Sequence, residues 1–134
     1  MSDAAIEFFV PMVPPTVTHN AMELHRIGKR TVLGKSDALV AAEAKWEAHL
    51  ARFAPERPLR GPLWADLRLC WPTEGKHAQG EPKDTKPDLD NVEKTFWDVL
   101  ERLGYYKGDQ QIVTKQVSKC WADPAGVYLR LEEI

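Results

Sequence analysis

Four segments of the chain have the apolar pattern of β-strands. In the clearest one, every second residue from Leu63 to Trp71 is apolar, and Pro72 ends the run. Such alternation predicts a strand with one buried face. The other three are rich in aromatic and β-branched residues or alternate after a turn. The predicted strands are residues 5–10, 63–71, 112–121 and 127–131.

Two further segments repeat their apolar residues every three or four positions, which predicts helices. The first covers about residues 37–54, with Ser36 as N-cap and Trp46 and Phe53 as core contacts. His49 beside this stripe is interpreted as packed or surface-exposed rather than catalytic. The second helix covers residues 89–103 and ends at Gly104. The order β-α-β-α-β-β predicts an α+β fold, with both helices packed against a single mixed sheet.

Two polar segments lack any period. Residues 16–35 contain glycine and several basic side chains, and we expect a surface loop or an arm that contacts phosphates. Residues 73–87 contain Gly75, Gly80, Pro82 and three lysines. This second segment is too polar in composition to pack, so we expect a mobile loop and a candidate flap over a substrate.

Composition sets the broad class of protein. The 134 residues are 43% hydrophobic and include five tryptophans, enough for one domain, residues 1–134, with its own core. No apolar run approaches the ~20 residues that cross a bilayer, and the N-terminus lacks the features of a signal peptide. Cys70 and Cys120 have no metal-type spacing, so we interpret them as reduced core residues of a cytoplasmic protein.

Charge permits a polyanionic partner without requiring one. The formal net charge is −2, whereas DNA-binding domains usually carry a positive excess. Basic residues nevertheless outnumber acidic ones in residues 19–36 and 102–119. The acidic residues gather at the termini and in one cluster, where a bound cation would offset part of their charge.

That cluster lies at the predicted start of the second helix. Asp88 and Asp90 are separated by one apolar residue, and Lys94 follows four positions after Asp90. A plain helix start would explain part of this, because Asp90 with Glu93 fits a capping box and Asp90 with Lys94 fits an ion pair. It does not explain Asp88.

Geometry decides whether the two aspartates can act together. Inside a helix, residues two positions apart point about 200° away from each other. They converge if Asp88 is extended and Asp90 begins the helix, and Pro87 keeps Lys86 extended, so the helix cannot begin much earlier. Asp109, in a turn before the next strand, would supply a third carboxylate.

Three carboxylates and a lysine suit hydrolysis of a phosphodiester. Carboxylate oxygens bind Mg²⁺ or Mn²⁺, and such a cation lowers the pKa of an attacking water and stabilises the leaving oxygen. Lys94 would neutralise charge that develops on the phosphate. A phosphatase with a nucleophilic aspartate would need a buried strand before Asp88, where the sequence is polar. A sugar-nucleotide transferase would need a larger domain.

The acidic cluster and the following turn resemble a known family. The relevant residues are Lys86-Pro87-Asp88-Leu89-Asp90-Asn91, Lys94, Asp98 and Gly104-Tyr105-Tyr106-Lys107-Gly108-Asp109-Gln110-Gln111-Ile112-Val113. They are similar to the patterns D-[LI]-D-N-x-x-K and Y-x-D-D-x-Q-[IV] of the RusA family of Holliday junction resolvases. A weaker similarity covers Pro14-Pro15 to Asn20. The chain departs from the pattern at Gly108, which replaces the first aspartate of the turn.

The resemblance implies a small homodimeric endonuclease of bacteria or their phages. Such enzymes bind four-way DNA junctions and make paired, symmetric nicks with Mg²⁺ or Mn²⁺, in DNA recombination and repair. Asp88, Asp90 and Asp109 match the metal-binding catalytic aspartates, and Lys94 matches the essential lysine. A two-fold symmetric protein would suit a junction with approximate two-fold symmetry.

Junction binding should rest on phosphate contacts. In the family, a run of arginines can precede the first aspartate. In this chain that run is reduced to Lys83 and Lys86. The candidate DNA-binding residues are Arg26, Lys29, Arg30, Lys35, Lys76, Lys83, Lys86, Lys107, Lys115 and Lys119. Two alternatives stay open: a non-catalytic module that binds branched DNA, and a nuclease that prefers flaps or forks.

Overall fold

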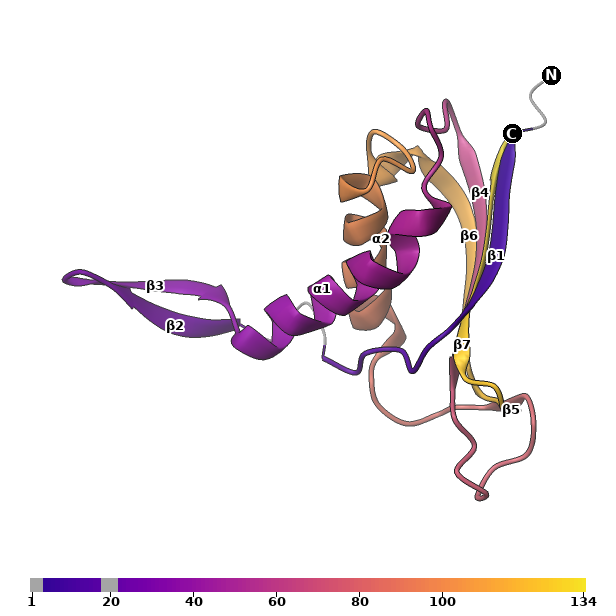
Figure 1. Ribbon diagram of the computed structural model, residues 1–134, viewed down its shortest axis with the longest axis horizontal. Coiled ribbons are helices and arrows are strands. Elements are labelled where there is room, and N and C mark those ends of the chain that lie inside the picture. Colours follow the sequence, from indigo (N-terminus) through magenta and orange to yellow (C-terminus); the bar gives the residue numbers. More distant parts are fainter. Residues whose placement is uncertain (1–3, 18–21) are drawn as a thin grey trace.

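The protein is a five-stranded sheet with two helices on one face and a hairpin that projects from the body (Figure 1). The computed structural model describes residues 4–17 and 22–134, so Asn20 lies outside the described residues. The sheet strands are β1 (Ala5–Pro11), β4 (Leu63–Trp71), β5 (Glu81–Pro82), β6 (Ile112–Trp121) and β7 (Gly126–Glu133). The remaining elements are β2 (Met22–Ile27), β3 (Arg30–Lys35), α1 (Asp37–Leu50), η1 (Ala51–Phe53), α2 (Leu89–Arg102) and η2 (Asp109–Gln111).

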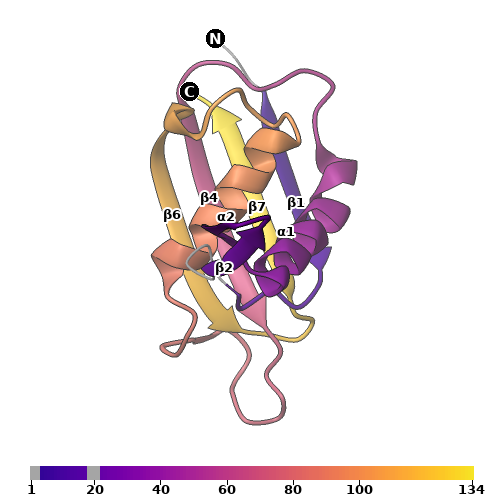
Figure 2. The same ribbon diagram turned by 90° about the vertical axis from the view of Figure 1, so that its left-hand side faces the viewer.

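The sheet is mixed, in the order β1-β7-β4-β6-β5. The pair β4–β6 is parallel, and the other pairs are antiparallel. The chain connects β4 to β6 through α2, as a parallel pair requires a crossover. Figure 2 shows α1 and α2 in front of the same sheet face. The predicted α+β class and the packing of both helices on one mixed sheet are confirmed.

The predicted alternation of β4 places its apolar set in the core. Leu63, Leu67 and Leu69 are 0% exposed, and they face the helices together with the apolar residues of β7. The first helix is also as predicted, because the Ser36 Oγ accepts a hydrogen bond from the Leu39 N–H at 3.1 Å. Its predicted last turn forms the separate 3₁₀ helix η1.

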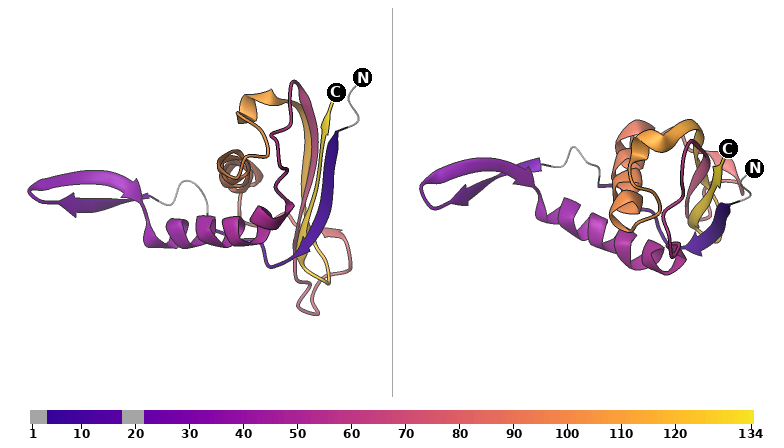
Figure 3. Two further views of the ribbon diagram at one scale, coloured as in Figure 1. Left: turned by 45° about the horizontal axis from the view of Figure 1, so that its top comes forward. Right: turned by 90° about the horizontal axis from the view of Figure 1, so that it is seen from above.

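The basic segment before α1 is not the irregular loop that its sequence predicts. Strands β2 and β3 form a two-stranded antiparallel sheet of their own, with Leu24 directly opposite Leu33. Both leucines are about two-thirds exposed, at 71% and 66%. The hairpin extends away from the sheet and helices in every view (Figure 3). A sequence without a buried face gives no alternation to detect, which explains why the prediction was wrong.

The expectation of an unpacked loop at residues 73–87 is also wrong. Two of its residues, Glu81 and Pro82, form β5 against β6, and the Gly80 N–H donates to the Trp121 carbonyl at 2.7 Å. Lys83 is only 9% exposed: its Nζ lies 4.0 Å from the Trp121 ring centroid and donates to the Thr85 Oγ1 at 2.7 Å. Cation–π contact lets a charged side chain pack where composition alone suggests none. Burial, with the nearby Lys119 charge, lowers the pKa of Lys83.

The two cysteines do not belong to the core, contrary to the prediction. Cys70 and Cys120 are direct partners on β4 and β6, with their Sγ atoms 3.4 Å apart. Both are half-buried free thiols on the sheet face away from the helices. Burial and the neighbouring thiol raise the pKa of Cys70 to about 12.

Candidate active site

Helix α2 has one face in the core and one face toward a polar hollow. Val92, Phe96 and Leu100 are 1% exposed or less and pack in the core. Asp90 and Lys94 are exposed and are four residues apart, so they lie on the same side of the helix. The amphipathic pattern of this helix therefore positions both predicted catalytic groups.

The start of α2 has the geometry that the two aspartates need. Asp88 is the N-cap, with extended backbone at φ −64° and ψ 136°, and its carbonyl accepts the Val92 N–H at 3.1 Å. Asp90 is the second residue of the helix. The expected arrangement, with Asp88 extended and Asp90 at the helix start, is confirmed. The alternative in which Asp90 caps the helix is wrong, because the helix begins at Leu89.

The turn that carries Asp109 is fixed by two buried tyrosines. The Tyr105 hydroxyl donates to the Leu50 carbonyl at 2.6 Å, and the Tyr106 hydroxyl donates to the Trp97 carbonyl at 2.7 Å. These bonds tie the turn to both helices. Burial raises the pKa of each tyrosine. For Tyr106, the nearby carboxylates of Asp109 and two residues of α2 raise the pKa further.

Gln111 holds the same turn from its other side. Its amide Nε2 donates to the carbonyls of Leu59 and Gly61 at 3.2 and 3.1 Å. Its Oε1 accepts the N–H groups of Lys107 and Gly108 at 3.0 and 3.1 Å. One side chain thus satisfies four backbone groups. It locks the turn to the loop before β4.

At Gly108 the family pattern has an aspartate. The backbone there is extended, at φ −155°, so no glycine is required by conformation. An added Cβ would lie 2.1 Å from the Gln110 Oε1 atom, the end of a flexible side chain. An aspartate at this position would therefore require Gln110 to move.

The helix face and the turn meet at one hollow of about 290 Å³. The hollow is lined by Asp90, Glu93, Lys94, Trp97, Asp109 and Lys115. A smaller hollow of about 190 Å³ adjoins it and shares Trp97, Asp109 and Lys115. Three of the four predicted catalytic residues therefore line the same space, although Asp109 is 19 residues after Asp90. We find no hydrogen bond to the carboxylates of Asp90 or Asp109 within the described part of the chain.

Glu93 is a member of this hollow that sequence reasoning assigned only to helix capping. It is 8% exposed and forms an ion pair with Lys115. The Trp97 indole N–H also donates to the Glu93 Oε1 at 3.0 Å. The spacing of Asp90, Glu93 and Trp97, three and four residues apart, is the signal that could have found it.

Asp88 is the predicted site residue that does not line this hollow. Its Oδ1 accepts a hydrogen bond from the Lys86 Nζ at 3.1 Å, and both side chains are more than half exposed. An exposed ion pair is worth about 0–1 kcal/mol, so this contact holds Asp88 weakly. Among residues 4–17 and 22–134, no three His, Cys, Asp or Glu side chains are grouped closely enough to hold a metal ion.

The chemical type of the nearby donors, rather than their spacing in this structure, suits a hard divalent cation. The hollow presents carboxylates from Asp90, Glu93 and Asp109 and has no thiol or imidazole among its lining residues. Oxygen ligands of this kind suit Mg²⁺ or Mn²⁺ rather than softer metals. A local surplus of carboxylates is also what a cation would neutralise.

The segment that leads to Asp88 is anchored by Lys119. Its Nζ donates to the carbonyls of Thr85 and Pro87, each at 2.7 Å. The charge of this lysine is therefore used inside the fold, next to the first aspartate of the site. Lys119 was predicted only as a DNA contact.

The other candidate DNA-binding residues are distributed over the molecule. Lys35 pairs with Glu43 at the base of the hairpin, beside a hollow of about 230 Å³ that also contains Asp98. Arg26, Lys29 and Arg30 lie on the hairpin. Lys76 is exposed in the loop after β4. Lys86 and Lys115 are paired as described, and Lys107 is exposed in the turn before Asp109.

Carboxylates and a lysine in one open hollow, on an α+β scaffold, are compatible with a protein of the phosphodiester-cleaving class. The sequence model of the family described as Endodeoxyribonuclease RusA matches residues 12–132, and the chain belongs to this family. The family is one of endonucleases that act on Holliday junctions, as the motifs had predicted.

One curated relative is similar over part of its length. The uncharacterized protein YqaN of Bacillus subtilis (strain 168) is 28% identical over 95 residues. The matched stretch covers 63% of this chain and 66% of that protein, just under two thirds.

Within the described residues, no helix is both long and apolar enough to span a membrane.

Proposed function

We propose that this protein is a divalent-metal-dependent, structure-specific DNA endonuclease that resolves four-way junctions by paired symmetric nicks. The observation that carries the proposal is the convergence of Asp90, Lys94 and Asp109 on one hollow. These residues come from α2 and from the turn before β6, and they coincide with the residues that the family motifs select. Junction resolution places the protein in DNA recombination and repair.

Asp88, Asp90 and Asp109 would hold the cation, which we propose to be Mg²⁺, with Mn²⁺ as a substitute. When bound, such an ion activates a water and stabilises the charge on the phosphate and its leaving oxygen. The exposed Lys94 ammonium would sit beside the phosphate and offset the charge that develops during cleavage. Glu93 and Trp97 would shape the wall of the hollow, with Lys115 held in place by Glu93.

We also propose the molecular context of this activity. Residues 1–134 form one endonuclease domain, and two copies form a homodimer. A two-fold symmetric pair of sites fits the two nicks of a junction with approximate two-fold symmetry. We place the protein in the cytoplasm of a bacterial cell, where the DNA substrate is, encoded by the host or by a phage.

The test is cleavage of a synthetic four-way junction by wild type and by Asp90→Asn in the presence of Mg²⁺. The variant keeps the size of the side chain and removes its charge, so we expect cleavage to fall by at least about 100-fold. Because Asp90 is exposed, the free energy of unfolding should change by less than about 0.5 kcal/mol.

Two results would contradict the proposal. One is an Asp90→Asn variant that cleaves the junction as fast as wild type. The other is a wild type that binds junctions but cleaves none with Mg²⁺ or Mn²⁺, which would leave a non-catalytic DNA-binding module. A parallel panel of flaps and forks measures the substrate preference.

A further inference from the structure

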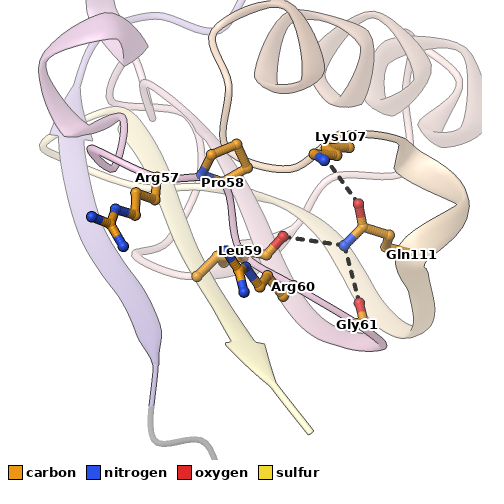
Figure 4. Close-up of a pocket in the computed structure, with 7 residues that line it drawn as sticks. All are labelled: Arg57, Pro58, Leu59, Arg60, Gly61, Lys107 and Gln111. Atoms are coloured by element: carbon orange, nitrogen blue, oxygen red, sulfur yellow. Dashed lines mark hydrogen bonds between the residues drawn. The ribbon is translucent and has the colours of Figure 1, made fainter.

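A second hollow, of about 400 Å³, lies on the other side of the turn that carries Asp109. It is lined by Arg57, Pro58, Leu59, Arg60, Gly61, Lys107 and Gln111. Figure 4 shows that the lining residues come from two segments, the loop before β4 and the turn after α2, which Gln111 connects. We call these seven residues the basic pocket.

Three of the seven residues are cations, and none is acidic. Arg57, Arg60 and Lys107 are all exposed, and their charged groups form no ion pair within residues 4–17 and 22–134. One acidic residue contacts the edge of the pocket, where the Glu133 Oε2 accepts the Arg60 backbone N–H at 2.8 Å. The pocket therefore has a positive charge that the fold itself does not use, in a chain whose net charge is −2.

The floor of the basic pocket is rigidly held. Leu59 is 6% exposed, and its N–H donates to the Tyr105 carbonyl at 2.9 Å. The Gln111 amide fixes the carbonyls of Leu59 and Gly61 from the opposite side. A preformed site loses little conformational freedom when a ligand binds. Pro58 and Leu59 add an apolar surface between the cations, which suits the deoxyribose of a nucleic-acid backbone.

The basic pocket and the acidic hollow share one short turn. Lys107 and Gln111 line the pocket, and Asp109, between them in sequence, lines the hollow. A strand of DNA whose phosphate is at the acidic hollow would thus meet the basic pocket as it continues across the turn. By contrast, the charges of Lys35, Lys86 and Lys115 are taken by carboxylates of the protein itself.

We propose that the basic pocket binds a backbone phosphate of the DNA arm that continues from the cleaved phosphodiester. This inference rests on the proposed nuclease function and assigns a role to Arg57 and Arg60, for which the family motifs give none. Arginine donates to phosphate oxygens through a planar, two-pronged group, so two arginines on one pocket favour phosphate over a single carboxylate.

The experiment measures binding to a four-way junction in EDTA, so that no cleavage occurs. The double variant Arg57→Gln/Arg60→Gln should bind about tenfold more weakly, and the slope of log Kd against log salt should fall by about 2. A scan with single neutral methylphosphonates then locates the contact. One or two positions beside the cleaved phosphodiester should weaken binding of wild type and have no effect on the double variant.

Two matched variants complete the test. Arg52→Gln removes an exposed charge that contacts the Phe53 ring and does not line the basic pocket, and it should show the methylphosphonate pattern of wild type. Arg60→Lys in place of Arg60→Gln keeps the charge. Compared with the double variant, it should restore part of the sensitivity of binding to the methylphosphonates.

The proposal is overturned if wild type and the double variant respond alike to every methylphosphonate. The same result is expected if the pocket binds an acidic protein partner instead of DNA. A wild-type protein that cleaves no junction would refute the nuclease function. The methylphosphonate scan in EDTA measures binding alone, so it would still test whether the basic pocket contacts a phosphate.

Discussion

Lys94 is the cation whose position in the acidic hollow has no structural explanation. Its neighbour Lys115 is paired with Glu93, whereas the exposed Lys94 ammonium has no hydrogen-bond or ion-pair partner in the described part of the chain. The ion pair with Asp90, which a helix start would provide, is not formed. A charge that the fold does not use, beside two unpartnered carboxylates, is consistent with a role toward the substrate.

We therefore expect Lys94→Ala to lower the turnover rate of junction cleavage by about 100-fold or more. Affinity for the junction in EDTA should stay within about threefold, because one exposed contact is lost among many. The free energy of unfolding should change by less than about 0.5 kcal/mol. Single-turnover cleavage, together with a binding titration, measures both quantities. Undiminished turnover would remove the catalytic role of Lys94.

At the scale of the element, the turn between α2 and β6 matters most. It places Asp109 at the acidic hollow and Lys107 at the basic pocket, and it has little regular structure of its own beyond the three residues of η2. Its position depends on Tyr105, Tyr106 and Gln111. Of these three, Gln111 alone binds backbone groups both in the turn itself and in the loop before β4.

Gln111→Ala should leave up to four backbone groups without their partner. We expect a loss of about 1–3 kcal/mol in the free energy of unfolding, with a lower cleavage rate because Asp109 is no longer fixed. Urea denaturation and junction cleavage measure the two effects. Gln110→Ala is the matched control, since this neighbour is exposed and its amide binds no described residue. Equal urea midpoints for the two variants would contradict the assigned role.

The same elements show what can be predicted from sequence and what cannot. Strand β4 and helix α2 could be predicted because burial of one face leaves a regular apolar pattern in the sequence. The arrangement of Asp88 and Asp90 could be predicted because Pro87 restricts where α2 can begin. The β2–β3 hairpin buries no face, so Leu24 and Leu33 give no signal. Lys83 packs between tryptophans that are distant in sequence, and Arg57 and Arg60 gain a shared pocket with Lys107 only through tertiary contact.

At the scale of the whole molecule, the buried tyrosines link stability to pH. Tyr105 and Tyr106 have raised pKa values in the folded protein, whereas tyrosines of an unfolded chain titrate near 10. Below about pH 10 both states keep the proton, and these residues add no pH dependence. Above it only the unfolded state releases the proton readily, so stability falls as the pH rises.

An alkaline titration tests this expectation. Tyrosinate absorbance measures ionisation, and near-ultraviolet circular dichroism measures native packing. We expect the two buried tyrosines to ionise only as the native packing is lost, above about pH 10. Tyr128 is accessible at the sheet face, but its hydrogen bond to Glu7 also raises its pKa. Ionisation of all three tyrosines in a protein that keeps its native dichroism would contradict the prediction.

The two faces of α2 also restrict how the chain can vary in length. One inserted residue within a helix turns everything after it by about 100° relative to everything before it. An insertion between Asp90 and Phe96 would therefore rotate Lys94 away from the aspartates or pull Phe96 out of the core. The hairpin tip at Gly28 and the loop around Gly75 have no such constraint, because both are exposed turns. Natural insertions and deletions among homologous chains should therefore collect at these two turns and be absent from residues 88–111.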